Sequence, residues 1–174
     1  MKRYYISGIA GTGKSAVGRE FKKLGYEVYD IDAIEGLCHW RHKKTGVKTK
    51  YNTGVGKEWL EVHEWICDEE KLKELLARNP EKSKIVVGIA SNQNKFISLF
   101  DKVFLLYCSP ETFIKRINTR NDGNYFGKDK SEQEQLLEWY KDFQQRMERL
   151  GAISINTEFP LEKVVENIRR EIST

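Results

Sequence analysis

Residues 3–15 carry the sequence Arg3-Tyr4-Tyr5-Ile6-Ser7-Gly8-Ile9-Ala10-Gly11-Thr12-Gly13-Lys14-Ser15. The segment from Gly8 to Ser15 matches the phosphate-binding loop pattern G-x-x-x-x-G-K-S/T at every position. Residues 4–6 form an aromatic and β-branched run that is typical of a strand. Residues 16–24 place apolar side chains at helical spacing. The sequence therefore predicts a strand, a glycine loop and a helix in the order that a phosphate site requires.

The chemistry expected of this loop follows from its residue types. Glycines allow backbone N–H groups to approach phosphate oxygens closely, and the helix N-terminus adds its positive dipole end. In this pattern the lysine reaches the β- and γ-phosphates and the hydroxyl ligates Mg²⁺. We therefore expect ATP and Mg²⁺ as cofactors. The alternative interpretation of the loop is a glycine-rich turn that matches the pattern by chance. The predicted cofactor-binding residues of the loop are Gly8, Gly11, Thr12, Gly13, Lys14, Ser15 and Ala16.

Two carboxylates follow the second predicted strand, in Asp30-Ile31-Asp32. Alternation along a strand puts both side chains on one face, at the carboxyl end where open α/β sheets bind ligands. One carboxylate can hold Mg²⁺ through water, and the other can accept the proton of an attacking hydroxyl. We predict that Ser15 and Asp30 serve the metal and that Asp32 orients or deprotonates the acceptor. The structural alternative is that both residues cap the following turn.

Predicted strands and helices alternate along the chain, which is the signature of a parallel sheet covered by helices on both faces. We expect one α/β domain over residues 1–174. The predicted strands are 4–6, 26–29, 85–90, 103–107 and 153–155. The predicted helices are 16–24, 58–78, 94–99, 109–120, 131–150 (opened by a capping box at Ser131) and a last helix after Pro160. Residues 33–57 are expected to be irregular and residues 121–130 to form a loop.

Composition narrows the class of protein. The chain has 174 residues, of which 39% are hydrophobic and 32% charged, and its net charge is +4. No apolar run reaches the roughly 18 residues of a membrane span, and the chain starts with a predicted strand rather than a signal peptide. The three cysteines favour a reducing compartment over a disulfide framework, so we expect a cytoplasmic protein.

The loop Gly8-Ile9-Ala10-Gly11-Thr12-Gly13-Lys14-Ser15 resembles the G-x-x-G-x-G-K-S/T variant of small-molecule P-loop kinases, namely nucleoside monophosphate kinases, shikimate kinase and gluconate kinase. The pair Asp30 and Asp32 looks like the D-x-D of shikimate kinase, which serves the magnesium and the substrate. The resemblance implies a three-layer P-loop NTPase fold with a five-stranded parallel sheet in the order 2-3-1-4-5.

The resemblance also extends to a short lid, about residues 116–130. Arg116 and Arg120 are similar to the R-x-x-x-R of adenylate kinases, in which the first Arg packs on adenine and the second contacts phosphate. Asn156 to Pro160 resembles the adenine-side loop. The resemblance thus implies Arg116 and Pro160 as cofactor-binding residues. The expected catalytic residues are Lys14, Asp32, Arg116 and Arg120.

The expected acceptor-binding segment, about residues 33–80, carries no substrate motif. Its part from Trp40 to Lys57 contains six basic residues and no acidic one, with Trp40 and Tyr51 interleaved. Cations with aromatics suit a phosphate-bearing or nucleobase-bearing acceptor, so a nucleoside or nucleotide ranks slightly first. A shikimate- or gluconate-type sugar acid ranks next. A slow ATP-hydrolysing regulator that binds protein or RNA, a kinase of nucleic-acid 5′ ends and a merely solvated basic loop stay open.

Two departures from the family pattern bear on the metal. The third strand ends in residues 88–92 without the triple glycine of shikimate kinase and without a Walker B acid. Separately, Cys38, His42, His63 and Cys67 form a mirrored pair with ligand-type spacing, which leaves a zinc site open.

Overall fold

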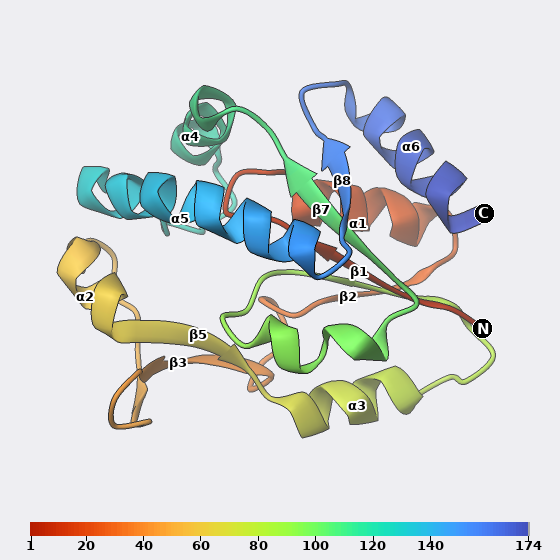
Figure 1. The fold of residues 1–174 in the computed structure, drawn as a ribbon, viewed down its shortest axis with the longest axis horizontal. Helices are drawn as coiled ribbons and strands as arrows, with labels where there is room; N and C mark the ends of the chain where they lie inside the picture. Colours follow the sequence, from red (N-terminus) through yellow and green to blue (C-terminus); the bar gives the residue numbers. More distant parts are fainter. Residues whose placement is uncertain (174) are drawn as a thin grey trace.

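The computed structural model describes residues 1–173, and Thr174, the last residue of the predicted domain, lies outside the described residues. Five parallel strands form the central sheet (Figure 1). They are β1 (Arg3–Ser7), β2 (Glu27–Asp30), β6 (Lys84–Val87), β7 (Lys102–Tyr107) and β8 (Ile153–Asn156). The strands lie in the order β2-β6-β1-β7-β8. Numbered within this sheet alone, that order is 2-3-1-4-5, so the predicted topology is confirmed.

Helices cover both faces of the sheet, because alternate strand residues point to opposite sides. Tyr4 and Ile6 pack with α1 (Lys14–Lys23) and α6 (Leu161–Ser173). Tyr5 points to the other face, where a second core cluster forms. That cluster includes side chains of α3 (Glu69–Ala77), α4 (Pro110–Thr119) and α5 (Lys130–Arg149). The two short 3₁₀ helices η1 (Gln93–Lys95) and η2 (Ile97–Leu99) replace the predicted helix at 94–99.

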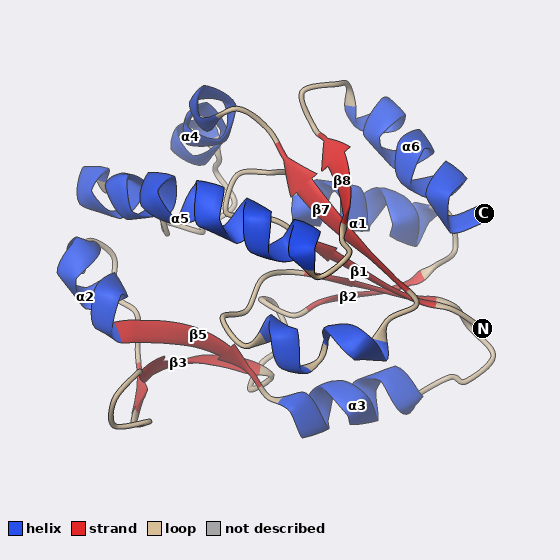
Figure 2. Ribbon diagram, viewed as in Figure 1, coloured by secondary structure: helices blue, strands red, loops and turns tan. Residues whose placement is uncertain are grey.

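A second sheet occupies the segment between β2 and β6, where the sequence predicted irregular structure followed by one long helix. Its antiparallel strands are β3 (Cys38–His42), β4 (Lys48–Thr49) and β5 (His63–Cys67), in the order β4-β3-β5 (Figure 2). The helix predicted at 58–78 is therefore wrong in its middle. It is divided into α2 (Gly56–Val62), strand β5 and α3. Trp59 and Val62 lie on α2, but Ile66, which continues their helical spacing, lies on β5, whose pairing to β3 decides its conformation.

Local capping signals were accurate at one helix and displaced at another. At α4, the Ser109 side chain accepts from the Thr112 amide at 3.2 Å, and Pro110 is the first helical residue, as predicted. The long helix α5 begins at Lys130 and is capped by Asp129, not by a capping box at Ser131. Asp129 takes this role because its carboxylate accepts from the Ser131 amide at 2.9 Å. Within residues 1–173, no helix is long and apolar enough to cross a membrane.

Candidate functional site

The glycine loop between β1 and α1 has the geometry of an anion site. Gly13 adopts a φ of 97°, a left-handed conformation that glycine tolerates and other residues resist. A Cβ at Gly8 would lie 2.6 Å from the Leu106 carbonyl oxygen, so the loop packs against β7 only with glycine there. Val17 donates its amide to the Gly13 carbonyl at 3.0 Å. The earlier N–H groups of α1 have no intrahelical partner and remain for a ligand.

Lys14 lies half-buried in this loop, and its ammonium is bonded to the protein. Its Nζ donates to the carbonyl oxygens of Gly8, at 2.6 Å, and of Ile9, at 3.0 Å. Burial lowers the pKa of Lys14, and the nearby carboxylates of Asp32 and Asp30 oppose that shift. The loop carbonyls thus hold the cation where phosphate oxygens would compete for it.

The two predicted carboxylates lie beside the loop and have different partners. Ser15 donates its hydroxyl to Asp30 Oδ2 at 3.0 Å. Asp32 Oδ1 accepts the indole N–H of Trp65 at 2.9 Å. Partial burial raises the pKa of Asp32, whereas Lys14 acts to lower it. Asp30 therefore adjoins the hydroxyl of the loop, and Asp32 faces the second sheet.

The oxygen atoms of Ser15 and Asp30 fit a magnesium ion. Mg²⁺ prefers oxygen ligands and is commonly held by one or two protein groups, with water and phosphate completing its shell. The hydroxyl and the carboxylate are already adjacent, at the N-terminus of α1 where the phosphates would lie. No larger cluster of metal-ligating side chains exists in residues 1–173.

A cleft of about 1370 Å³ opens in front of the loop. One end is lined by Lys14, Ser15 and Asp32. Its lining includes residues of β5 from the second sheet and residues of α5, and α5 lies above β5 in the view of Figure 1. The aromatic lining residues are Trp40, Tyr51, Trp65, Tyr125, Phe126, Trp139 and Phe143. A cleft of this size holds two small molecules end to end, since ligand pockets measure roughly 300–1,000 Å³ each.

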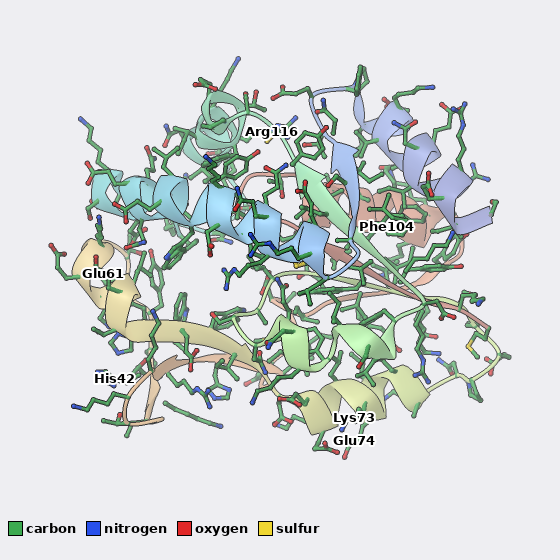
Figure 3. All side chains as sticks on the ribbon, viewed as in Figure 1. His42, Glu61, Lys73, Glu74, Phe104 and Arg116 are labelled. Carbon is green, nitrogen blue, oxygen red and sulfur yellow. The ribbon has the colours of Figure 1, made fainter. Side chains whose placement is uncertain are left out.

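The predicted lid arginines line the cleft but are already hydrogen-bonded. Arg116 lies on α4 (Figure 3) and donates to Thr157, to its Oγ1 at 3.1 Å and to its carbonyl oxygen at 2.7 Å. Arg120 caps the end of α4 and donates to the carbonyl oxygen of Asn124 at 2.8 Å and to that of Phe126. Pro160 lies outside the cleft lining. We call residues 120–129, which connect α4 to α5, the lid loop.

The lid loop packs against Trp40 of the second sheet and against Tyr51. The Phe126 ring lies 6.1 Å from the Trp40 ring and 5.6 Å from the Tyr51 ring, centroid to centroid. Glu132, which is completely buried, accepts the Gly127 amide at 2.8 Å. The same carboxylate accepts the Tyr51 hydroxyl at 2.8 and 3.0 Å. Sequence reasoning missed this link, because its partners lie 81 residues apart.

The basic segment from Trp40 to Lys57 does not assemble a cationic pocket. Arg41 pairs with Glu64 at 2.8 Å, and Lys57 pairs with Glu138. Lys43 lines the cleft but donates to the Glu61 carbonyl oxygen at 2.6 Å. The exposed lysines outside the cleft lining are Lys44, Lys48 and Lys50. Because these cations are already bonded or lie outside the cleft lining, the basic segment gives no evidence that the acceptor carries a phosphate.

The four possible zinc ligands form two separate pairs. Strands β3 and β5 place Cys38 opposite Cys67 at one end of the ladder and His42 opposite His63 at the other. Four residues along a strand span about 13 Å, so the thiols and imidazoles do not share one ion. His42 marks the outer end of this sheet in Figure 3.

These features define the class of protein. The phosphate loop, the 2-3-1-4-5 sheet and the carboxylates at the end of the second strand of that sheet resemble those of the P-loop small-molecule kinase group. The profile of the AAA domain family matches residues 5–137, and the chain belongs to that family.

Solved structures with the same fold include small-molecule kinases. Deoxyadenosine kinase from M. mycoides, solved with dCMP and a flexible dCDP, has 17% identity, a TM-score of 0.60 and coverage of 98% of each chain. Shikimate kinase from Acinetobacter baumannii, in complex with shikimate, has 20% identity and a TM-score of 0.60, covering 99% of this chain and 93% of its own. Shikimate kinase from Aquifex aeolicus has 20% identity and a TM-score of 0.58, covering 98% and 96%. No curated protein sequence matches the chain.

Proposed function

We propose that this protein is an ATP-dependent phosphotransferase that moves the γ-phosphate of ATP to a small acceptor, a nucleoside or nucleotide ahead of a shikimate-type sugar acid. The observation that carries the proposal is the placement of Lys14 and Asp32 at one end of a cleft walled by aromatic side chains. In this proposal, ATP binds at the phosphate loop with Mg²⁺ on Ser15 and Asp30. The acceptor binds against residues 33–80, and residues 116–130 close over it.

Phosphoryl transfer depends mainly on positioning and on neutralising the spread charge of the transferring group. Free amides at the start of α1 and the Lys14 ammonium hold the β- and γ-phosphates. Arg116 and Arg120 add positive charge from α4 and the lid loop. When bound, Mg²⁺ neutralises charge on the phosphate oxygens.

Asp32 acts on the acceptor in this scheme. The acceptor oxygen forms a bond to the γ-phosphorus while the bond from that phosphorus to the bridging oxygen of ADP breaks. Because Asp32 Oδ1 already accepts the Trp65 N–H, Oδ2 is the oxygen that takes the proton from the acceptor hydroxyl. Asp32 then releases this proton to solvent. The products are the phosphorylated acceptor, ADP and a proton.

A transfer assay with radiolabelled ATP and Mg²⁺, run over nucleosides, nucleotides and sugar acids, tests the proposal. The matched variant is Asp32→Asn, which keeps an oxygen for the Trp65 N–H. We expect it to bind ATP normally and to transfer phosphate about 10²–10⁴ times more slowly, the usual size of a general-base effect. Equal losses of ATP affinity and of transfer would contradict the role given to Asp32. Transfer to no compound of the panel would contradict the proposed activity.

A further inference from the structure

The wall of the cleft formed by the second sheet presents a pair of tryptophans. Trp40 on β3 and Trp65 on β5 are directly opposite each other, with ring centroids 5.5 Å apart. Both line the cleft and both are half-buried. Because the Trp65 N–H is bonded to Asp32, the indole lies next to the carboxylate that faces the reacting atom.

The wall formed by α5 presents a third tryptophan, which packs against the hydrophobic core. Trp139 is half-buried and lines the same cleft. Within residues 1–173 its ring stacks on no other aromatic ring, and its N–H makes no hydrogen bond, whereas Trp40 and Trp65 each contact other rings. An indole that lines a cleft with no other ring stacked on it offers a surface to a planar ligand.

A polar side chain also lines this cleft. Asn94 lines the cleft on η1 and is exposed, and its amide has no hydrogen-bond partner in the described chain. The segment that carries it is tied to β5, because the Ser91 amide donates to the Trp65 carbonyl oxygen at 2.7 Å. A carboxamide offers one acceptor and two donors, which suit the edge of a nucleobase.

The charges around the reacting end argue against a phosphate on the acceptor. Asp32 suits a neutral hydroxyl, which must lose a proton, whereas it repels an acceptor phosphate, which has already lost one. Among the cations of the cleft, the function proposed above assigns Lys14, Arg116 and Arg120 to the phosphates of ATP. Lys43 donates to the Glu61 carbonyl oxygen, and Arg146 pairs with Asp142 at 3.0 Å. Of the cleft cations without such a partner among residues 1–173, Arg19 lies on α1 beside the phosphate loop. Arg149 lies ten residues beyond Trp139 on α5, about 15 Å along the helix.

We propose, on the basis of the function proposed above, that the acceptor is a nucleoside and not a nucleotide or a sugar acid. Its sugar hydroxyl faces Asp32. Its base lies between the Trp40–Trp65 pair and Trp139, with an edge toward Asn94. The oxygen of that hydroxyl forms the new bond to the γ-phosphorus, so the products are a nucleoside monophosphate, ADP and a proton.

Direct binding tests this inference without any need for turnover. Isothermal titration in the absence of ATP uses the common ribonucleosides and deoxyribonucleosides, each beside its 5′-monophosphate, together with shikimate. We expect at least one nucleoside to bind more tightly than its monophosphate and than shikimate. The variant Trp139→Ala should weaken nucleoside binding by about 5- to 150-fold, the range for loss of one base–aromatic stack, with ATP affinity unchanged. Leu137→Ala is the matched control on the same helix, because Leu137 is exposed outside the cleft lining.

The outcomes separate the two proposals. Tighter binding of a monophosphate or of shikimate, binding of no nucleoside, or equal effects of Trp139→Ala and Leu137→Ala would overturn the inference. If transfer to a sugar acid is then found, the phosphotransferase proposal stands alone. If a nucleoside binds with the expected Trp139 dependence but accepts no phosphate from ATP, the binding site stands and the proposed activity fails.

Discussion

The buried carboxylate of Glu132 gives the most direct test of how the lid loop is held. The substitution Tyr51→Phe removes the hydroxyl that donates to this carboxylate and leaves the ring packing unchanged. Glu132 then keeps the Gly127 amide as a donor but has lost its side-chain partner. Since burial and Glu132 both raise the pKa of Tyr51, the hydroxyl is protonated and is a donor at neutral pH.

The expected cost of Tyr51→Phe is about 2 kcal/mol of unfolding free energy, because hydrogen bonds to charged groups contribute roughly 1.5–3 kcal/mol and Glu132 is fully shielded from water. For a chain of this length such a loss lowers the midpoint of thermal unfolding by about 4–8 °C. If the same substitution lowers the free energy of opening of the lid loop by this amount, hydrogen exchange at the Gly127 amide should be about 30-fold faster.

Urea or thermal denaturation and amide exchange measure these effects. The control is Tyr125→Phe, since Tyr125 is also in the lid loop but is 55% exposed and its hydroxyl makes no hydrogen bond within residues 1–173. The control should change stability by less than about 0.5 kcal/mol. A Tyr51→Phe protein as stable as this control, with unchanged Gly127 exchange, would refute the assigned role of Glu132.

Four further predictions concern the site. Lys14→Ala should abolish ATP-dependent transfer, while circular dichroism shows that the variant is still folded. Full turnover by the folded variant would rule out the phosphate-loop assignment. Asp30→Asn should be partly rescued by raised Mg²⁺ in a transfer assay, and the absence of rescue would separate Asp30 from the metal. Because the pKa of Asp32 is raised, kcat/KM should fall as pH drops through a value above the roughly 3.9 of a free Asp. The Asp32→Asn variant should lose this acid limb, and a profile unchanged by that substitution would exclude Asp32 as the base. Replacing Lys44, Lys48 and Lys50 by Gln should leave the acceptor KM within about twofold in a salt series, whereas a tenfold rise would place these lysines at the acceptor.

The phosphate loop could be predicted from a local pattern, and the order of the five parallel strands from the resemblance of that loop to P-loop kinases. Strand β5 could not be predicted, since Ile66 continues the helical spacing of Trp59 and Val62, and pairing with β3 overrides that spacing only from His63 onward. The Trp65–Asp32 contact joins residues 33 apart in the chain, beyond the reach of a local pattern.

The basic segment illustrates a second limit. Six cations in sequence suggested an anion site, but Arg41 and Lys57 have acidic partners on other elements. Charge pairing across elements is a property of the fold, and the composition of a segment does not reveal it. Lys14 is a similar case, because its partners are carbonyl groups, which every residue carries.

Glu132 connects the lid loop to the wall of the cleft, because its carboxylate accepts both the Gly127 amide and the Tyr51 hydroxyl. If one ligand orders the lid loop and another packs on Tyr51, the two share a free energy of coupling. Thermodynamic linkage requires that each ligand then change the affinity of the other by the same factor. Loss of this one carboxylate should therefore reduce the factor by which each substrate changes the affinity of the other. That factor is measured as the ratio of the acceptor dissociation constants with and without nucleotide.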